Sequence, residues 1–419
     1  MAASSTQGSK VSMHVQTGFG NPYSGSKKDI RLEGNPDFKT PGSEGTVPAE
    51  VFADANQTAK PVVLEKYITG GLKVDTNIHC GDGAEPSAVT LFRAGGYTVA
   101  SNTDTSLTAY SSSTSFTTAT ATKAGTLAAI ERVDGKIEPA LQVNAGSTTF
   151  IPAMELSSAS ASGKEVINMY TITPGSAGAI PGDSLVTMDA TFRYKDSSGK
   201  YKSFQAQDVA TMSVGDLSLE PGSLITLSFN LGASKMTQKT LTTTWPANDF
   251  NDVADTEPFS CALLQYADAD SSGGISAEYL KLFKATVSFG VTAEAVTGFG
   301  NTTCINNLQE WMMKTTPATI TLDALYDSTK LGDFTNVNNP DKYIGIIQAT
   351  ESLDKPAFAF IMPNAHLLEA PQADLWSQNE HRLTLKYVAR PAGFTHMSSA
   401  IASDALNQPW YLGISTSKV

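Results

Sequence analysis

The residues with the clearest spacing for metal chemistry lie in the segment Asp268-Ala-Asp270-Ser-Ser272-Gly273. Side-chain oxygens at positions one, three and five, followed by glycine at six, resemble the opening of a twelve-residue calcium-binding loop. The bidentate acid belongs at position twelve, but Tyr279 stands there and Glu278 comes one residue early. We therefore interpret the segment as a surface turn followed by a helix that Ser276 caps, and we expect no bound metal.

A second short motif, Gly182-Asp183-Ser184-Leu185, spells the signature of the GDSL esterases. In that chemistry the serine is the nucleophile, and a histidine that follows an aspartate by three residues activates it. The residues three places before His366, His381 and His396 are Pro, Gln and Gly. The tetrapeptide also opens a predicted strand, and the expected alternation of strands and helices is missing. We therefore expect no esterase.

Histidine, the other common metal ligand and catalytic base, is scattered along the chain. The five histidines are His14, His79, His366, His381 and His396, and no two of them stand two or four residues apart. Metal sites need converging ligands, and in a strand His79 and Cys80 would point to opposite sides. No phosphate-binding loop, dinucleotide fingerprint or nucleophile elbow occurs either. The sequence predicts no catalytic, cofactor or metal site, and no enzyme.

The composition excludes further classes of function. The chain has 419 residues, enough for a sizeable core, and a net charge of -12, which argues against an electrostatic grip on nucleic acid. Tyrosine and tryptophan are not interleaved with basic runs, which argues against base stacking. The start lacks the apolar segment of a secretory signal, no apolar run approaches a membrane span, and three separated cysteines (Cys80, Cys261, Cys304) give no disulfide framework. We expect synthesis in a reducing cytoplasm and no membrane partner.

The most informative stretch runs over residues 212–231, MSVGDLSLEPGSLITLSFNL. Apolar and polar residues alternate at period two on both sides of Glu220-Pro221-Gly222-Ser223, which has the residue types of a tight turn. This pattern predicts a hairpin of two half-buried antiparallel strands. One face is hydrocarbon, and the other is small, polar and acidic, without a lysine or arginine.

The rest of the chain is organised in three predicted parts. Residues 1–60 are rich in glycine and proline and predict an extended N-terminal arm. Residues 61–255 form a first β half, with a Gly70-Gly71 turn, a hairpin or short helix over 87–101, and a Ser/Thr-rich insertion around 101–181. Residues 256–419 form a second β half, in which Leu308, Trp311 and Met312 predict a helix near 306–314.

Amphipathic strands dominate both halves. The alternation predicts strands over residues 184–194, 285–291, 318–324, 343–349, 357–361 and 382–389. A polar segment, 241–258, links the two halves. We predict a mainly β fold, a β-sandwich or barrel with antiparallel hairpins and minor α-helix.

Three of these segments resemble the tail tube proteins (major tail proteins) of long-tailed bacteriophages. The first is a strand, an acidic Pro/Gly turn and a second strand over 224–232. The second is the unit of the second half that ends in TTPATITLDALYD (315–327). The third is the closing hairpin, PAFAFIMPNAHLLEAPQADLWSQNEHRLTLKYVARP (356–391). The resemblance covers about 180–391, and the matching segments contain no catalytic motif. The Ser/Thr-rich insertion departs from compact members of the family.

The resemblance implies a structural virion protein, made in the host cytoplasm, that forms rings, commonly hexameric, which stack into a hollow tail tube. Strands would join across subunits around a lumen that passes DNA and the tape-measure protein without binding them tightly, and tail terminator and tail-tip proteins would be further partners. A polar, acidic wall suits such a conduit, because binding phosphate requires cations. The candidate lumen-facing residues are Asp216, Ser218, Glu220, Thr226, Ser228, Asn230, Ser288, Thr319, Thr321 and Asp323.

Two other interpretations stay open from the residues. The polar face is equally typical of a solvated exterior, since antiparallel sheets commonly expose one face to water. The Ser/Thr-rich stretch would also suit a β-sandwich adhesin or a carbohydrate-binding module.

Overall fold

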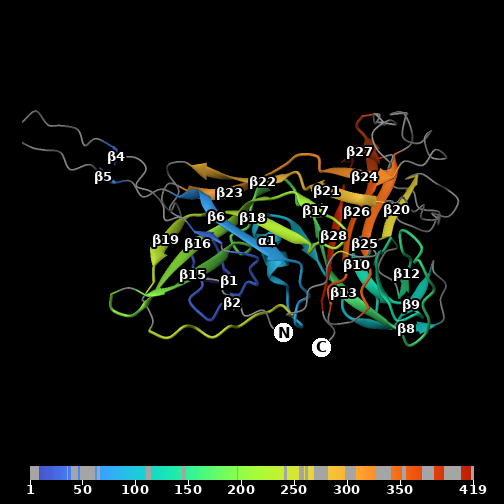
Figure 1. Cartoon of the computed structure of the whole chain (residues 1–419), viewed down its shortest axis with the longest axis horizontal. Coiled ribbons are helices and arrows are strands. Elements are labelled where there is room, and N and C mark those ends of the chain that lie inside the picture. The colour runs from blue at the N-terminus through green and yellow to red at the C-terminus, as the bar shows by residue number, and fades with distance from the viewer. Residues whose placement is uncertain are drawn as a thin grey trace, which may run out of the picture.

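The computed structural model describes residues 9–34, 36–38, 46–47, 62–63, 67–109, 115–143, 148–195, 197–239, 243–253, 259, 263–268, 282–297, 308–325, 341–351, 355–369, 382–390 and 407–416. These residues form an 11-stranded sheet, a 15-stranded sheet, a two-stranded ribbon and one helix (Figure 1). The pairings within the sheets are antiparallel, so the predicted mainly β fold is confirmed.

The 11-stranded sheet contains β1 (Ser9–Val15), β2 (Lys28–Asp29), β3 (Asp37–Phe38), β6 (Ile68–Asn77), β14 (Gly178–Ala179), β15 (Val186–Lys195), β16 (Tyr201–Val214), β18 (Thr226–Ala233), β19 (Lys235–Gln238), β22 (Val291–Thr297) and β23 (Leu308–Thr315). The 15-stranded sheet contains β7 (Thr98–Ala100), β8 (Thr105–Ala109), β9 (Phe116–Thr118), β10 (Leu127–Glu131), β11 (Ile137–Leu141), β12 (Thr149–Phe150), β13 (Glu165–Thr173), β17 (Leu217–Leu219), β20 (Leu263–Asp268), β21 (Leu282–Ser288), β24 (Thr319–Leu325), β25 (Lys342–Gln348), β26 (Phe358–Leu367), β27 (Arg382–Ala389) and β28 (Tyr411–Ser415). The ribbon pairs β4 (Thr46–Val47) with β5 (Val62–Val63), and the helix is α1 (Ser87–Ala94).

Three strands of the first sheet continue into three strands of the second. The chain passes from β16 to β17 through Gly215, from β21 to β22 through Gly290, and from β23 to β24 through Pro317. The three strands keep the same neighbours on both sides of the bend. In the first sheet β22 pairs with β16 and with β23. In the second sheet its continuation β21 pairs with their continuations, β17 and β24. We call these three continuous strands, with β18 beside β16, β6 beside β18 and β27 beside β24, the bent layer.

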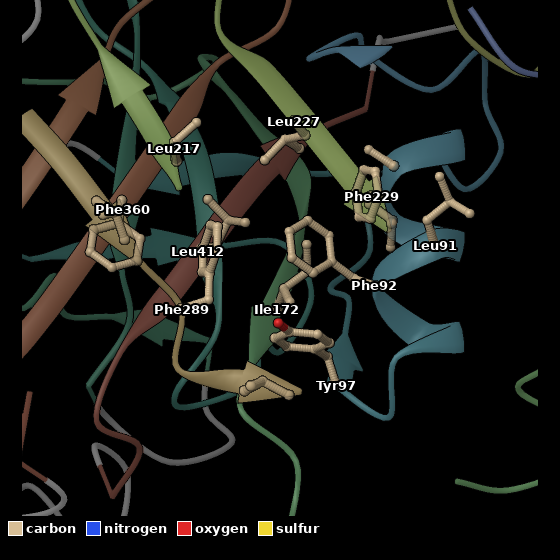
Figure 2. Packing of buried hydrophobic residues seen from close by; sticks show 14 of the residues in the cluster. Leu91, Phe92, Tyr97, Ile172, Leu217, Leu227, Phe229, Phe289, Phe360 and Leu412 are labelled. Atoms are coloured by element: carbon tan, nitrogen blue, oxygen red, sulfur yellow. The ribbon is translucent and has the colours of Figure 1, made fainter. Parts of the chain in front are cut away.

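One large core lies beneath the bent layer. Leu217, Leu227 and Phe229 from the layer pack with Phe92 of α1 and with Phe289, which lies at the bend (Figure 2). The ring of Phe92 lies edge-to-face against Phe229 and Phe289, at centroid distances of 5.2 and 5.7 Å. Such pairs add to the stabilisation from burial alone. Of the hairpin and the short helix predicted for residues 87–101, the structure has the helix, α1.

The core joins the two halves that the sequence predicts. Its buried members come from both sides of residue 255, and β17 of the first half pairs only with β21 of the second among the described strands. In the polar segment between the halves, residues 243–253 form only isolated β-bridges, and Val253 N–H donates to the carbonyl of Cys80 at 2.9 Å. The halves are thus interlocked in one core and share their sheets.

The Ser/Thr-rich insertion forms a smaller lobe with its own core. Leu107 on β8 and Phe116 on β9 are buried together with Phe150 and Ile130. The serines and threonines between such residues occupy strands and turns, as the β propensity of threonine favours. Figure 1 shows β8, β9 and β12 at one end of the molecule.

The first described segment of the predicted N-terminal arm, β1, is packed into the fold. β1 pairs with β15 over its whole length, from Ser9 opposite Phe192 to Val15 opposite Val186. Val11 and Met13 are buried, because alternation places them on the core side of the sheet. The expectation of an extended arm is wrong for this segment, and residues 1–8 and most of 39–61 lie outside the described residues.

Two local predictions are also wrong, each because of a β-bulge. Gly70 and Gly71 do not form a turn, since β6 runs through them opposite β18 with a register shift. The predicted helix near 306–314 is strand β23. A register shift between β22 and β23 near Gln309 places Leu308 and Trp311 on the same buried side, which imitates helical spacing.

Within the part of the chain that the structure describes, no helix is long and apolar enough to cross a membrane.

Candidate functional site

The turn at the centre of the candidate site has the expected geometry, but its two strands do not pair. Gly222 has a φ of 85°, and Ser223 N–H donates to the carbonyl of Glu220 at 3.1 Å. β18 continues beside β16 and β6, whereas β17 turns away and pairs with β21. The predicted hairpin therefore forms only at its base, where Ser213 and Val214 on β16 pair antiparallel with β18, and the bend at Gly215 turns β17 away to another partner.

The polar residues nevertheless remain on one side of the molecule. Along β21 and β22 the buried residues alternate without interruption through the bend, so Thr286, Ser288 and Thr292 share the opposite, outer side. Ser218 on β17 stands opposite Thr286, and Thr286 stands opposite Thr321 on β24. These three residues form one polar row across the second half of the layer.

A second row continues the surface across the first half of the layer. Ser213 on β16 pairs with Thr292 on β22, and Asn230 on β18 pairs with Ser213. The side chain of Asn230 donates to the Ser213 hydroxyl at 3.0 Å. Thr226 and Ser228 lie on the same side of β18 as Asn230, because Leu227 and Phe229 between them are buried.

The outer side of the bent layer therefore gathers the ten residues singled out from the sequence. We call this surface the outer face; its candidate residues are Asp216, Ser218, Glu220, Thr226, Ser228, Asn230, Ser288, Thr319, Thr321 and Asp323. They are half-buried or exposed, and Asp216 lies exposed in the bend between β16 and β17. Residues from four strands, separated by up to about a hundred positions, thus meet on one surface.

Short polar contacts hold these side chains in place. Ser228 donates to the carboxylate of Asp75 on β6 at 2.6 Å, and Thr384 on β27 donates to Asp323 at 2.8 Å. Cross-strand pairs of this kind stabilise a sheet by modest amounts each. The face is therefore a fixed lattice of hydroxyl and carboxylate groups.

The outer face also carries lysines that the sequence stretch alone did not reveal. Lys284 on β21 lies 2.5 Å from Glu220, Lys73 on β6 lies 3.1 Å from Asp75, and Lys314 on β23 pairs with Glu294. Carboxylates on the same face pair with these three ammonium groups. The three lysines therefore offer little uncompensated positive charge to a polyanion. The expectation of a wall without cations is wrong, because these three paired lysines lie on it and Lys386 on β27, exposed and in register with Thr321, adds a further cation on the same side.

The Glu220–Lys284 pair shifts both groups toward their charged forms. The hydrogen bond from Lys284, and then its charge, lower the pKa of Glu220, and the same two interactions raise the pKa of Lys284. Both groups are solvent-exposed, so water and salt screen this interaction.

The motifs discounted from the sequence fall in separate places. Ser184 lies in a turn before β15, where its backbone N–H donates to Pro181. The ring of His14 stacks on Tyr23, and His366 bonds Asp341 at 2.8 Å. Residues 269–273 of the calcium-like loop, as well as His381 and His396, lie outside the described residues. The described residues contain no group of three or more His, Cys, Asp or Glu side chains arranged to hold a metal.

One cluster was missed from the sequence. At the tip of the β15–β16 hairpin, the guanidinium of Arg193 lies over the Trp245 ring, 5.3 Å from its centroid, and the ammonium of Lys195 lies 4.9 Å from the Tyr201 centroid. The two rings meet edge-to-face at 5.1 Å. The spacing of basic and aromatic residues over 193–202 was a signal, but Trp245 joins from a distant segment. The expectation that aromatic and basic residues are not interleaved is wrong here.

The sequence matches no known family model, and no curated protein matches it either.

Proposed function

We propose that the chain is a structural subunit that assembles into rings, and that these rings stack into a hollow tube, the tail tube of a long-tailed bacteriophage. The observation that carries this proposal is the gathering of the ten candidate residues on one outer face. In a ring this face would surround the lumen, and DNA and the tape-measure protein would pass along it.

The chemistry of the outer face supports a conduit. Hydroxyls and carboxylates do not release counterions from a nucleic acid, and release of that kind supplies most non-specific affinity for DNA. Lys284 and Lys73 stand beside Glu220 and Asp75, so they are compensated locally. A passing phosphate therefore meets no unpaired cluster of cations among these residues.

Edge strands of the layer support assembly. β17 has three residues and pairs only with β21 among the described strands. A sheet edge offers backbone groups to another strand, few of them where the strand is this short, and a head-to-tail contact between identical chains closes into a ring or propagates as a filament.

Electron microscopy of the purified protein in negative stain tests the proposal. We expect rings or tubes with a stain-filled centre at high protein concentration. A sample that shows only monodisperse globules at all concentrations, pH values and salt conditions tried would contradict it.

A further inference from the structure

The tip of the β15–β16 hairpin has the opposite charge from the rest of the molecule. Residues 193–202 include Arg193, Lys195, Lys200 and Lys202 but only one acid, Asp196, in a chain whose net charge is -12. Arg193 and Lys195 are exposed, and Gly199, with a φ of 74°, makes the turn between the strands. We define the hairpin tip as Arg193, Lys195, Tyr201 and Trp245.

Aromatic rings hold the two cations of the hairpin tip in a ladder. Arg193 lies on Trp245, Trp245 meets Tyr201 edge-to-face, and Tyr201 carries Lys195. Cation–π contacts orient the charged groups without neutralising them. A guanidinium stacked in this way keeps its N–H groups free at the rim of the ring, where they suit a carboxylate.

The position of the hairpin tip suits contact with another molecule. Figure 1 shows the β15–β16 hairpin toward one end of the long axis, opposite the lobe of β8, β9 and β12. A basic surface at one end of an otherwise acidic chain is complementary in charge to other copies of that chain. Complementary patches at different places on identical molecules give head-to-tail contacts.

We propose that the hairpin tip is a docking surface for an acidic surface on a second copy of this chain. The inference rests on the proposed function, because it supplies a contact between subunits besides the sheet edges. A nucleic acid fits the hairpin tip less well. Arg193 and Lys195 occupy ring faces on which bases would stack, and the acidic remainder of the chain repels phosphates.

Charge reversal at the hairpin tip tests this surface. We expect Arg193→Glu with Lys195→Glu to weaken self-association by at least about tenfold in sedimentation velocity, and raised salt to weaken the wild type likewise. Lys123→Glu with Lys136→Glu is the matched control, because it changes the net charge equally at exposed positions elsewhere. The control should associate like the wild type.

Microscopy of the same samples separates this inference from the proposed function. If the tip variant forms tubes as readily as the wild type, the docking surface is wrong and the tube stands. If the wild type forms only non-tubular oligomers that the tip variant loses, the docking surface stands and the tube is wrong. A wild type that stays monomeric contradicts both.

A fluorescent single-stranded 30-mer, titrated with each variant, tests the nucleic-acid alternative. We expect no saturable binding by the wild type at physiological salt. Binding that the tip variant loses, together with unchanged self-association, would assign the hairpin tip to nucleic acid and overturn the inference.

Discussion

The carboxylate of Glu220 on the turn after β17 lies 2.5 Å from the ammonium of Lys284 on β21. This contact joins the stretch that the sequence singled out to a strand more than sixty residues later. It also places a cation on a face that we expected to lack one. Charge compensation between neighbouring strands is therefore part of the chemistry of the outer face.

The first prediction concerns this pair. Replacing Lys284 with methionine removes the hydrogen bond and charge that lower the pKa of Glu220, so that pKa should rise toward its ordinary value. A carboxyl-detected NMR titration measures it directly. Lys314→Met, which removes a cation paired with Glu294 instead, should leave Glu220 unchanged. An unaltered Glu220 titration in Lys284→Met would contradict the pairing.

The second prediction concerns the bend of the layer. Gly290 has a φ of 66°, and a Cβ there would lie 2.2 Å from the carbonyl oxygen of Thr316. Gly290→Ala therefore combines backbone strain with a steric clash and should lower the free energy of unfolding by several kcal/mol, about 3 or more. Chemical denaturation followed by tryptophan fluorescence measures the loss.

Gly135 is the matched control for this substitution. It has a φ of 82° but no atom within 4 Å of the added Cβ. Gly135→Ala should therefore cost only the conformational term, about 1–2 kcal/mol. Equal losses at the two positions would show that close packing at the bend does not matter.

The third prediction concerns a buried carboxylate on β16, within the bent layer. Asp208 accepts hydrogen bonds from the Gln16 amide at 2.8 Å, from Gly20 N–H at 2.6 Å and from the Ser234 hydroxyl. Asp208→Ala leaves these donors buried without their acceptor and should cost about 3–5 kcal/mol of stability. Thermal and chemical denaturation measure the loss.

Two further variants make the Asp208 test specific. Asp208→Asn keeps the shape and tolerates the positive φ of 48° at this position, so it should cost less than alanine. Asp183→Ala removes an exposed carboxylate and should be nearly neutral. If Asp208→Ala were as mild as Asp183→Ala, the network would not contribute to stability.

The fourth prediction concerns the stability of the fold at acidic pH. Burial, and next the charge of Arg31, lower the pKa of His79 to about 4 from an ordinary 6.5. A histidine whose pKa falls on folding contributes stability that is present above 6.5 and is lost as the pH drops toward 4. The full loss from this group is about 3 kcal/mol.

The buried carboxyl groups nearby act with the opposite sign. Burial raises the pKa of Asp252 and of Asp29, so the folded state takes up their protons more readily than the unfolded state does. The effect of His79 is therefore isolated with His79→Gln, which cannot titrate. The variant should lose less stability than the wild type between pH 6.5 and 4.5. Parallel pH profiles would contradict the assignment.

The sequence predicted strand positions well because alternation is local. The segment 382–389 coincides with β27, and Leu217 and Leu219 are buried as expected. Strand partners were not predictable in the same way. The bend at Gly215 sends β17 to β21, and no local pattern encodes which distant strand completes a sheet.

The candidate site was predictable in part for the same reason. Polar alternation found the residues of the outer face, but the lysines came from neighbouring strands that only the fold brings together. The hairpin tip needed Trp245, which lies more than forty residues from Tyr201 and Arg193. At 306–314, a bulge changed the period of the buried residues and produced a false helix.

In the proposed tube, the outer face lines the lumen. Cysteine accessibility tests this placement in a background where Cys80, Cys261 and Cys304 are replaced by serine or alanine and which still assembles. Ser228→Cys places a thiol on the outer face, and Val133→Cys places one at a position in the insertion lobe that is 56% exposed. A maleimide carrying a 5-kDa polymer serves as the probe.

Both thiols should react in dissociated subunits. In assembled tubes we predict that Ser228→Cys is protected, whereas Val133→Cys still reacts at close to its rate in the subunit. Equal reactivity of Ser228→Cys in tubes and in subunits would place the outer face on the exterior and contradict the account.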